Sequence, residues 1–355
     1  NTKYKIVLGD WFVEPSVEYA WEHSSIDYDS DVQGVEDFSS RDYLKEQVGD
    51  FNLRGGYETG DWEIIPSINI NYLRRNYLVE SETDDVFAGY GLQIERKFNR
   101  AHNLSFNADY GLQYPDLNDI KNTYQIESST EVITGGYPID LATKGYSASV
   151  RYRNFIVEKS TFIFARASYN YNEDVVSNYN QEYGNYILSG YVPAPHSQVF
   201  STGIFVGYEL DFIPIRIEPD ADFSWSDGFT TTLEGEFPSQ KFGQSYELEF
   251  ESRWDFPLNA EIGVEYRQEN VESEERGNRE YNSWEPKIEL EYEAGNFRIE
   301  SDFSYEISGT EDIESDLYIL DIEADYELKG LPLTLKVEAE NLLNLDPRER
   351  VRSTF

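Results

Sequence analysis

Residues 246–254 read YELEFESRW, and apolar or small residues alternate there with charged ones at every step. Residues 260–267, AEIGVEYR, repeat the alternation. Successive side chains of a β-strand point to opposite faces of a sheet, so a period of two predicts strands with one apolar and one polar face. The helical spacing of apolar residues at i, i+3 and i+4 does not occur in these stretches, and we therefore expect an all-β fold.

The same alternation continues on the C-terminal side of this stretch, in residues 288–292, 299–307, 320–328 and 333–339. Short connections rich in Gly, Pro and Asn, which suit tight hairpins, lie at 58–61, 99–102, 158–160, 212–214, 256–259, 294–296 and 329–332. Long polar connections are expected at 23–45, 79–84, 115–142, 173–198, 227–242, 272–283 and 309–316. Seven hairpins give 14 strands; a strand near 11–22 precedes them, and residues 348–355 supply a candidate for a sixteenth.

Short turns at one end and long loops at the other are typical of bacterial outer-membrane barrels, in which the short turns are periplasmic. Many segments alternate over about 9–11 residues, which is the length that a tilted strand needs to cross a bilayer. Tyr and Trp stand near segment ends, where interfacial aromatic girdles are expected, for example Trp62, Trp254 and Tyr266. We predict a transmembrane antiparallel β-barrel of roughly 14–16 strands in the bacterial outer membrane. A secreted all-β protein with aromatic core residues is the alternative.

Composition excludes several other classes of protein. The 355 residues include 68 acidic ones against 29 Lys and Arg, which gives a net charge of −39. Nucleic-acid binding is therefore not expected, because there is no basic stripe to displace counterions from phosphates. Aromatic residues make up 15% of the chain, which excludes a disordered acidic tail. Cysteine is absent, so disulfides, thiol catalysis and Cys-ligated metals are excluded.

The polar faces of the later strands are strongly acidic. We expect these acids to point into the lumen, with Glu249, Glu251, Glu265, Glu291, Asp302, Asp321, Glu323 and Asp325 as the candidate lumen-facing residues. Few bases offset them, and adjacent like charges are unfavourable unless water, cations or a basic partner screens them. The pattern therefore fits a cation-attracting lumen, a wall that faces a basic plug, or a solvated polar face without selectivity.

Catalytic and metal-binding motifs are not found. His23, His102 and His196 do not have the spacing of a zinc site. A Gly-x-Ser-x-Gly nucleophile elbow does not occur either. We expect no enzyme activity, no catalytic residue, no metal and no cofactor.

Two segments resemble a known family. Leu333–Asn344 ends in Asn-Leu-Leu-Asn and is similar to the penultimate strand of TonB-dependent outer-membrane receptors. Asn107–Ile120 contains Tyr-Pro-Asp-Leu and resembles the strand-to-loop passage of the Bacteroidetes outer-membrane β-barrel branch of that family. The turn expected after it reads Gly-Gly-Tyr-Pro at 135–138, which departs from the Gly-Asn-Pro-like pattern. The resemblance covers roughly residues 40–345.

The resemblance implies substrate uptake driven through a plug domain and the TonB energy-coupling system, and it allows a surface lipoprotein as a partner. Residues 1–355 are expected to form a single barrel domain in contact with outer-membrane lipid, and nothing in them resembles a plug. Family barrels have about 22 strands, so we expect the chain to be the C-terminal barrel portion of a longer receptor. A passive cation-preferring porin, or a barrel subunit of a larger outer-membrane assembly, is the alternative.

Overall fold

The computed structural model describes residues 2–29, 39–77, 81–120, 124–128, 131–134, 138–156, 160–184, 186–210, 212–232, 235–275, 277–310, 313–328 and 333–343. Within these ranges 19 strands form one sheet, accompanied by one short helix. Fifteen strands make an antiparallel meander: β3 (Trp11–Asp29), β4 (Ser39–Thr59), β5 (Trp62–Tyr77), β6 (Ser81–Asn99), β7 (His102–Gln113), β10 (Thr143–Ile156), β11 (Thr161–Tyr183), β12 (Tyr186–Glu209), β13 (Ile215–Thr232), β14 (Gly235–Ser252), β15 (Leu258–Ser273), β16 (Gly277–Ala294), β17 (Phe297–Thr310), β18 (Glu314–Glu327) and β19 (Thr334–Ala339).

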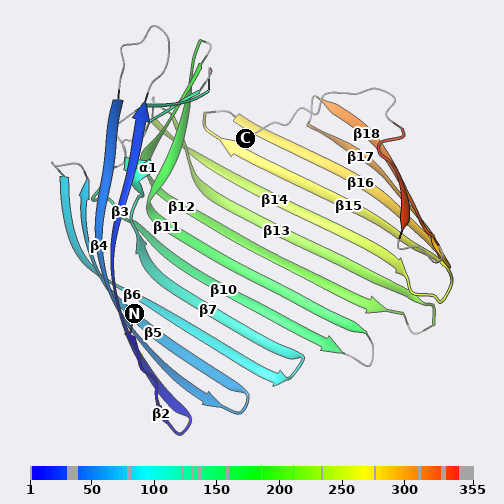
Figure 1. Cartoon of the computed structure of the whole chain (residues 1–355), viewed down its shortest axis with the longest axis horizontal. Helices are drawn as coiled ribbons and strands as arrows, with labels where there is room; N and C mark the ends of the chain where they lie inside the picture. The colour runs from blue at the N-terminus through cyan, green and yellow to red at the C-terminus, as the bar shows by residue number, and fades with distance from the viewer. Residues whose placement is uncertain are drawn as a thin grey trace.

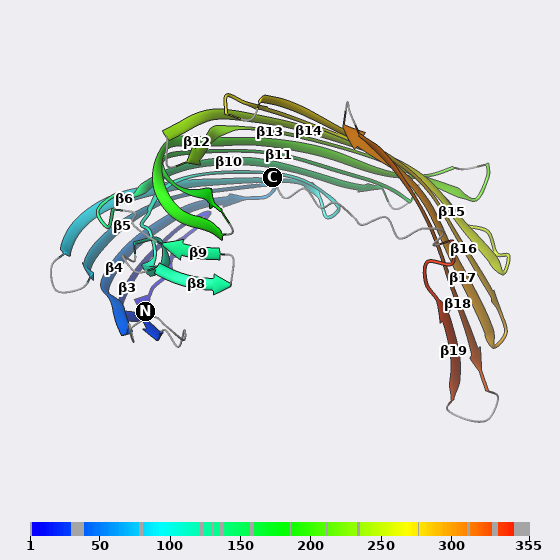
Figure 2. The ribbon, with the colours of Figure 1, turned by 90° about the horizontal axis from the view of Figure 1, so that it is seen from above.

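The smaller elements lie at the edge and inside of this meander. β1 (Thr2–Lys3) and β2 (Ile6–Leu8) pair with β3. β7 pairs directly with β10, and the chain between them forms α1 (Leu117–Ile120), β8 (Tyr124–Ser128) and β9 (Glu131–Thr134). In Figure 2, β8 and β9 lie within the concavity of the arched sheet.

The sheet is an open arch, and it does not close into a barrel. Among the described residues, no pairing joins β19 to β1, β2 or β3, and Figure 2 shows the two edges apart. The predicted all-β antiparallel class is confirmed. The meander of fifteen strands lies within the predicted 14–16, and four short strands bring the sheet to 19. The sixteenth strand expected at 348–355 lies outside the described residues. No described helix is long and apolar enough to cross a membrane.

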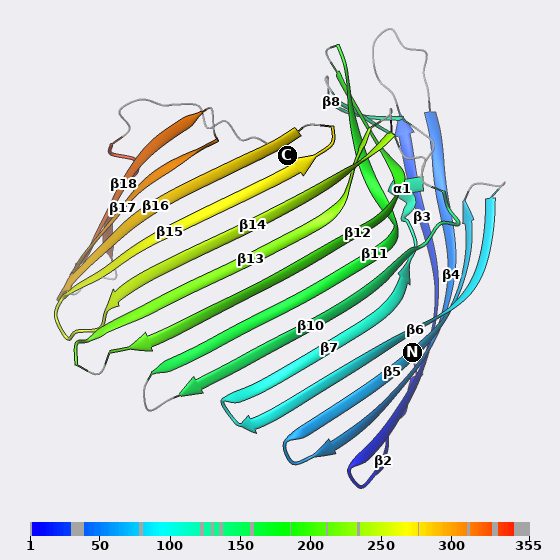
Figure 3. The ribbon, with the colours of Figure 1, turned by 180° about the vertical axis from the view of Figure 1, so that it is seen from behind.

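The short turns gather at one end of the sheet, as predicted. Figures 1 and 3 show the β4–β5, β6–β7, β12–β13, β14–β15 and β16–β17 connections at the same end. Gly60 and Gly295 occupy two of these turns with φ of 47° and 68°, a left-handed backbone that glycine adopts without a Cβ penalty. The turn residues expected at 158–159 and 329–332 lie outside the described part of the chain.

The prediction of long loops at the other end is largely wrong. The stretch 173–198 belongs to β11 and β12, 227–242 belongs mostly to β13 and β14, and 272–283 is mostly the start of β16. Likewise, β6 begins at Ser81 and β17 runs to Thr310, inside the loops expected at 79–84 and 309–316. A backbone ladder that has begun in the bilayer can continue pairing in water, where the outer face no longer has to be apolar. The period-two signal therefore disappears while the strand does not.

Cross-strand register separates the two faces of the sheet. Residues paired across an antiparallel ladder share a face, so rows can be followed from strand to strand. One row, from β13 to β18, is apolar: Ile217, Phe250, Ile262, Ile288, Phe303 and Leu320. The adjacent row on the opposite face is almost entirely acidic: Arg216, Glu251, Glu261, Glu289, Asp302 and Asp321.

The acidic row is on the inner, concave face. Leu44 and Tyr77 pack against α1, which belongs to the segment lying inside the arch. The face that carries Leu44 can be followed by cross-strand pairs, together with steps of two residues within a strand, through β5, β6, β7, β10, β11 and β12 to Arg216 of β13 and its row. The apolar rows consequently lie on the outer, convex face. Ile262 is 52% exposed there and Ile204 is 48% exposed.

Aromatic side chains border the apolar outer face at both ends. Towards the end opposite the short turns, Tyr90, Tyr110 and Tyr146 stack in sequence with ring centroids 5.0 and 4.7 Å apart. Near the short turns, the rings of Trp11 and Tyr57 lie 4.6 Å apart. An exposed apolar band between two aromatic girdles is the surface of a strand sheet that crosses a bilayer, and the chain is an outer-membrane protein.

A pair of neighbouring substitutions tests the faces. Ile262→Arg puts a guanidinium on the outer face near the middle of the band and should lower the free energy of unfolding by about 2–4 kcal/mol. Glu261→Arg, on the inner face, removes one carboxylate from the acidic row and should leave stability unchanged or raised. Urea unfolding of the protein refolded in lipid vesicles measures both; equal destabilisation by the two variants would contradict the assignment of faces.

Candidate functional site

The inner face is the candidate functional surface. Register places all eight predicted residues on it: Glu249 and Glu251 in β14, Glu265 in β15, Glu291 in β16, Asp302 in β17, and Asp321, Glu323 and Asp325 in β18. That this face lines a closed lumen stays a prediction, because the sheet is open.

Carboxylates face carboxylates across several ladders of this wall. Besides the row through Glu251 and Asp321, a second row joins Glu291, Glu300, Glu323 and Glu338. Like charges placed directly opposite each other are destabilising. Such a wall is sustained by its few bases and by screening from solvent ions.

Lys287 and Arg298 each offset part of the negative charge of this wall. The ammonium of Lys287 lies 2.6 Å from the Glu247 carboxylate and also contacts Glu249. Gly263 provides the space, because a Cβ there would lie 2.6 Å from Lys287 Cε. Arg298 reaches Glu291 at 2.5 Å and Glu300 at 2.7 Å. Each base thus bridges two acids, which leaves the wall strongly negative.

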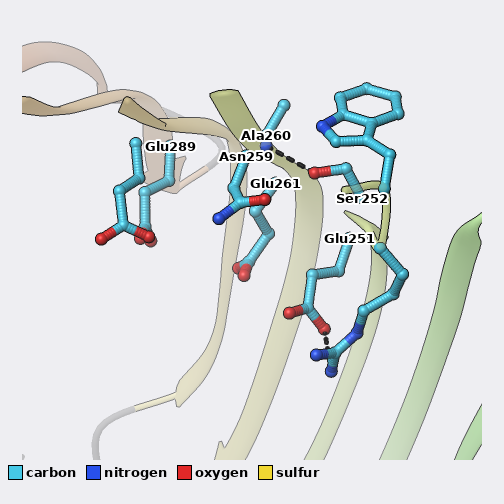
Figure 4. Close-up of a pocket in the computed structure, with 9 residues that line it drawn as sticks. Glu251, Ser252, Asn259, Ala260, Glu261 and Glu289 are labelled. Atoms are coloured by element: carbon cyan, nitrogen blue, oxygen red, sulfur yellow. Dashed lines mark hydrogen bonds and ion pairs between the residues drawn. The ribbon is translucent and has the colours of Figure 1, made fainter. Parts of the chain in front are cut away.

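A hollow of about 290 Å³ lies at the rim of this wall, next to the β14–β15 turn. Figure 4 shows Glu251, Glu261 and Glu289 around it, while Ser252 accepts a hydrogen bond from the Ala260 N–H at 2.7 Å. Arg253 pairs with Glu251 at 2.8 Å.

Three carboxylates of the same wall, those of Glu289, Glu300 and Asp302, have oxygens within 4.8 Å of one another. They offer three oxygen ligands, whereas Ca²⁺ takes six to eight. The arrangement suits transient attraction of cations better than a fixed metal site.

The polar segment between β7 and β10 folds inward and is fastened by Arg75. This side chain is 1% exposed and its Nε lies 2.7 Å from a Glu46 carboxylate oxygen. It also donates to the backbone carbonyls of Pro115 and, at 3.4 Å, Ile139. The guanidinium therefore ties both ends of the segment to the inner wall of β4 and β5.

A small apolar core completes this attachment. Leu44 and Tyr77 from the wall pack with Leu117 and Ile120 of α1, and further apolar side chains cover them: Ile139, Leu141, Val176 and Tyr191. Nearby, the Tyr114 hydroxyl donates to Asp85. Burial, followed by this hydrogen bond, raises the pKa of Tyr114, so the phenol stays protonated. The sequence prediction of a plain loop at 115–142 missed this structure, although its isolated Leu and Ile residues were a signal.

The hairpin of β11 and β12 also bends towards the interior. Figure 2 shows β12 curling towards β9, and the two strands pair in parallel from Ile187 to Ser189. The bend includes Asp174, a non-glycine residue with φ of 55°. Thr143 donates to its carbonyl at 2.9 Å and Lys144 pairs with its carboxylate at 3.0 Å. Two segments far apart in sequence thus meet over the inner face at this end.

Two of the histidines are found in structural contacts. His196 Nε2 lies 3.0 Å from Asp227 Oδ2 on the outer face. His102 stacks on Phe98 with ring centroids 4.2 Å apart. The expected lack of catalytic and metal-binding function stays a prediction.

Comparisons with known proteins give distant structural likenesses. The copper transporter OprC aligns over 94% of this chain and 57% of its own, with 13% identity and a TM-score of 0.48. The outer membrane transporter YddB from Escherichia coli aligns over 92% of this chain and 60% of its own, with 9% identity and a TM-score of 0.32. Salmonella typhi OmpF, in complex with daunomycin, gives 95% and 92%, with 11% identity and a TM-score of 0.28. No protein-family model and no curated protein matches the sequence.

The attachment of the inward segment is testable at Arg75. Arg75→Met should lower the free energy of unfolding by about 3 kcal/mol, because the Glu46 carboxylate and two carbonyls lose a buried donor. Arg74→Met is the matched control, since Arg74 is exposed and pairs with exposed Glu82, and it should change stability little. Urea titration combined with limited proteolysis measures both; an Arg75→Met protein as stable and protease-resistant as the parent would contradict the anchoring role.

Proposed function

We propose that this chain forms part of the wall of an outer-membrane β-barrel that transports hydrophilic solutes and favours cations. One observation carries the proposal: a single continuous sheet has an apolar, aromatic-bordered outer face and a strongly acidic inner face. The apolar face suits lipid, and the acidic face suits a water-filled path that concentrates positive charge.

In its finer form, the proposal is the barrel of a TonB-dependent receptor. The resemblance of Leu333–Asn344 and of Asn107–Ile120 to that family supports it. So does the edge at β19, which pairs only with β18 among the described strands, because an open edge inside a bilayer leaves backbone groups without partners. The proposal requires further strands that complete a wider barrel, and a wide barrel needs a plug to stay closed.

A passive cation-preferring porin is the second candidate. The acidic rows of β14 to β18 favour it, because they would select cations without a plug or an energy source. Both candidates share the fold and the location; they differ in whether the resting protein conducts.

Planar-bilayer recording on the full-length gene product separates them. A receptor should be silent and conduct only after deletion of a plug, and this is the result we expect. A porin should show steady cation-selective conductance, with a preference that fades as the Debye length falls from about 30 Å at 0.01 M salt to about 3 Å at 1 M. Conductance of the intact protein would end the receptor proposal.

Replacing acids of the wall by Gln tests its role in ion selectivity, either in the intact protein, if that conducts, or in the plug-deleted protein. Glu251→Gln, Glu261→Gln and Glu289→Gln together should reduce the cation-to-anion permeability ratio at low salt by several-fold. The matched control replaces Glu272, Glu274 and Glu275 by Gln at the far end of the β15–β16 hairpin, which should change the ratio little. An unchanged ratio in the wall variant would show that these acids do not line the path.

A further inference from the structure

Three arginines stand together on the inner face, in β10 and β11. Arg151 is the cross-strand partner of Arg166, and Arg153 follows Arg151 by two residues on the same face. Directly opposite residues have Cβ atoms about 4.5–5.5 Å apart, and like charges in that position repel. The inner wall, which is strongly acidic from β13 to β18, thus contains a local concentration of guanidinium groups in β10 and β11.

One of the three arginines has a carboxylate partner. Arg166 lies 3.1 Å from Asp222 Oδ1, although Asp222 is two strands away in β13. Gly203 stands between them in the register, and a Cβ there would lie 2.1 Å from that carboxylate oxygen. Glycine at this position therefore opens the path for the contact. Arg166 remains 61% exposed in spite of it.

Arg151 and Arg153 are exposed, and neither has an ion pair with a carboxylate of the described residues. Other arginines of the inner face do pair with carboxylates: Arg54, Arg75, Arg216, Arg253, Arg267 and Arg298. On the β7 side, the cross-strand partners of Arg151 and Arg153 are Ser105 and Asn103, which are uncharged. On the β11 side Arg151 faces Arg166 and Arg153 faces Phe164, so neither guanidinium has a carboxylate at a cross-strand position. The Glu95 carboxylate lies one strand beyond β7, where Asn103 donates to it at 3.3 Å.

We propose that Arg151, Arg153 and Arg166 form a subsite for an oxyanion, a carboxylate or phosphate group carried by the transported solute. Guanidinium groups bind both kinds of oxyanion through paired, charge-assisted hydrogen bonds. A bound oxyanion also relieves the repulsion between Arg151 and Arg166. The inference rests on the proposed transport function and narrows its substrate class.

The nearby acidic wall adds a second requirement on the solute. Its carboxylates begin in β13 with Glu218 and Asp220, and β13 is two strands from β11, about 10 Å at the usual spacing of about 4.8 Å per strand. A solute bound by its oxyanion at the arginines would meet carboxylates with its other groups. The substrate class that fits both surfaces is therefore a dipolar solute, with an anionic group and a cationic one.

Calorimetric titration of the full-length, detergent-purified protein at low ionic strength tests the subsite. Inorganic phosphate is the probe in one arm and citrate in the other. Saturable binding of either probe, weakened at least tenfold by Arg151→Gln and by Arg153→Gln, is the expected result, and the arm that binds identifies phosphate or carboxylate. Arg253→Gln is the control, because Arg253 is already paired with Glu251 at the rim. No saturable binding, or equal weakening by the control, would overturn the proposal.

Two further measurements distinguish a failure of the subsite from a failure of folding and from a failure of the proposed transport function. Arg151→Lys retains the charge and loses the planar fork, so its affinity should fall between those of the parent and Arg151→Gln. Heat-modifiable gel mobility and vesicle insertion of each variant report folding. A parent that inserts in membranes but binds neither probe would refute the subsite alone; a parent that does not insert would refute the transport proposal itself.

Discussion

Backbone pairing is the constraint on which the rest of this structure depends. In hydrocarbon, an unpaired N–H or C=O costs several kcal/mol, so strands that cross a bilayer must be paired on both sides. Pairing fixes register, and register fixes which residues share a face. A single parity therefore extends over the fifteen strands from β3 to β19, and it separates the apolar row through Ile262 from the acidic row through Glu261. Lipid contact and the charge of the inner wall both follow from that one ladder.

On the inner face, the fixed register places like charges next to each other. Because register dictates neighbours, Glu261 meets Glu251 and Glu289, and Arg151 meets Arg166, whether or not their charges suit. The chain compensates with long bases that bridge two acids, as Lys287 does, and with glycines that open room for a contact, as Gly203 and Gly263 do. Compensation is incomplete in both regions, which leaves one part of the wall negative and a smaller part positive.

Sequence alone predicts the parts of the fold that depend on local alternation. The strands from β14 to β19, the short turns and the shared face of the eight candidate acids follow from period two and turn residues. It does not predict the extended hairpins, because strands in water lose alternation, nor the contact of Arg75 with Pro115 and Ile139, which joins residues 40 and 64 positions apart. The pairing of Arg151 with Arg166 is likewise not predicted, since it depends on the exact register between β10 and β11.

If the inner wall lines a transport path, as proposed, its two charged regions act on a solute in opposite senses and limit which solutes can cross. A simple anion is attracted to the arginines and repelled by the larger acidic wall; a simple cation is drawn to the acids and repelled by the arginines. A dipolar solute can satisfy both regions if its charges are separated along the wall. The inward segment held by Arg75 and the bent β11–β12 hairpin lie over the same face. Under the proposed function, a solute entering from that end would pass them before it reaches either region. The inward segment and the bent hairpin would then select solutes by size and shape first, and the charged regions of the wall would select them by charge afterwards.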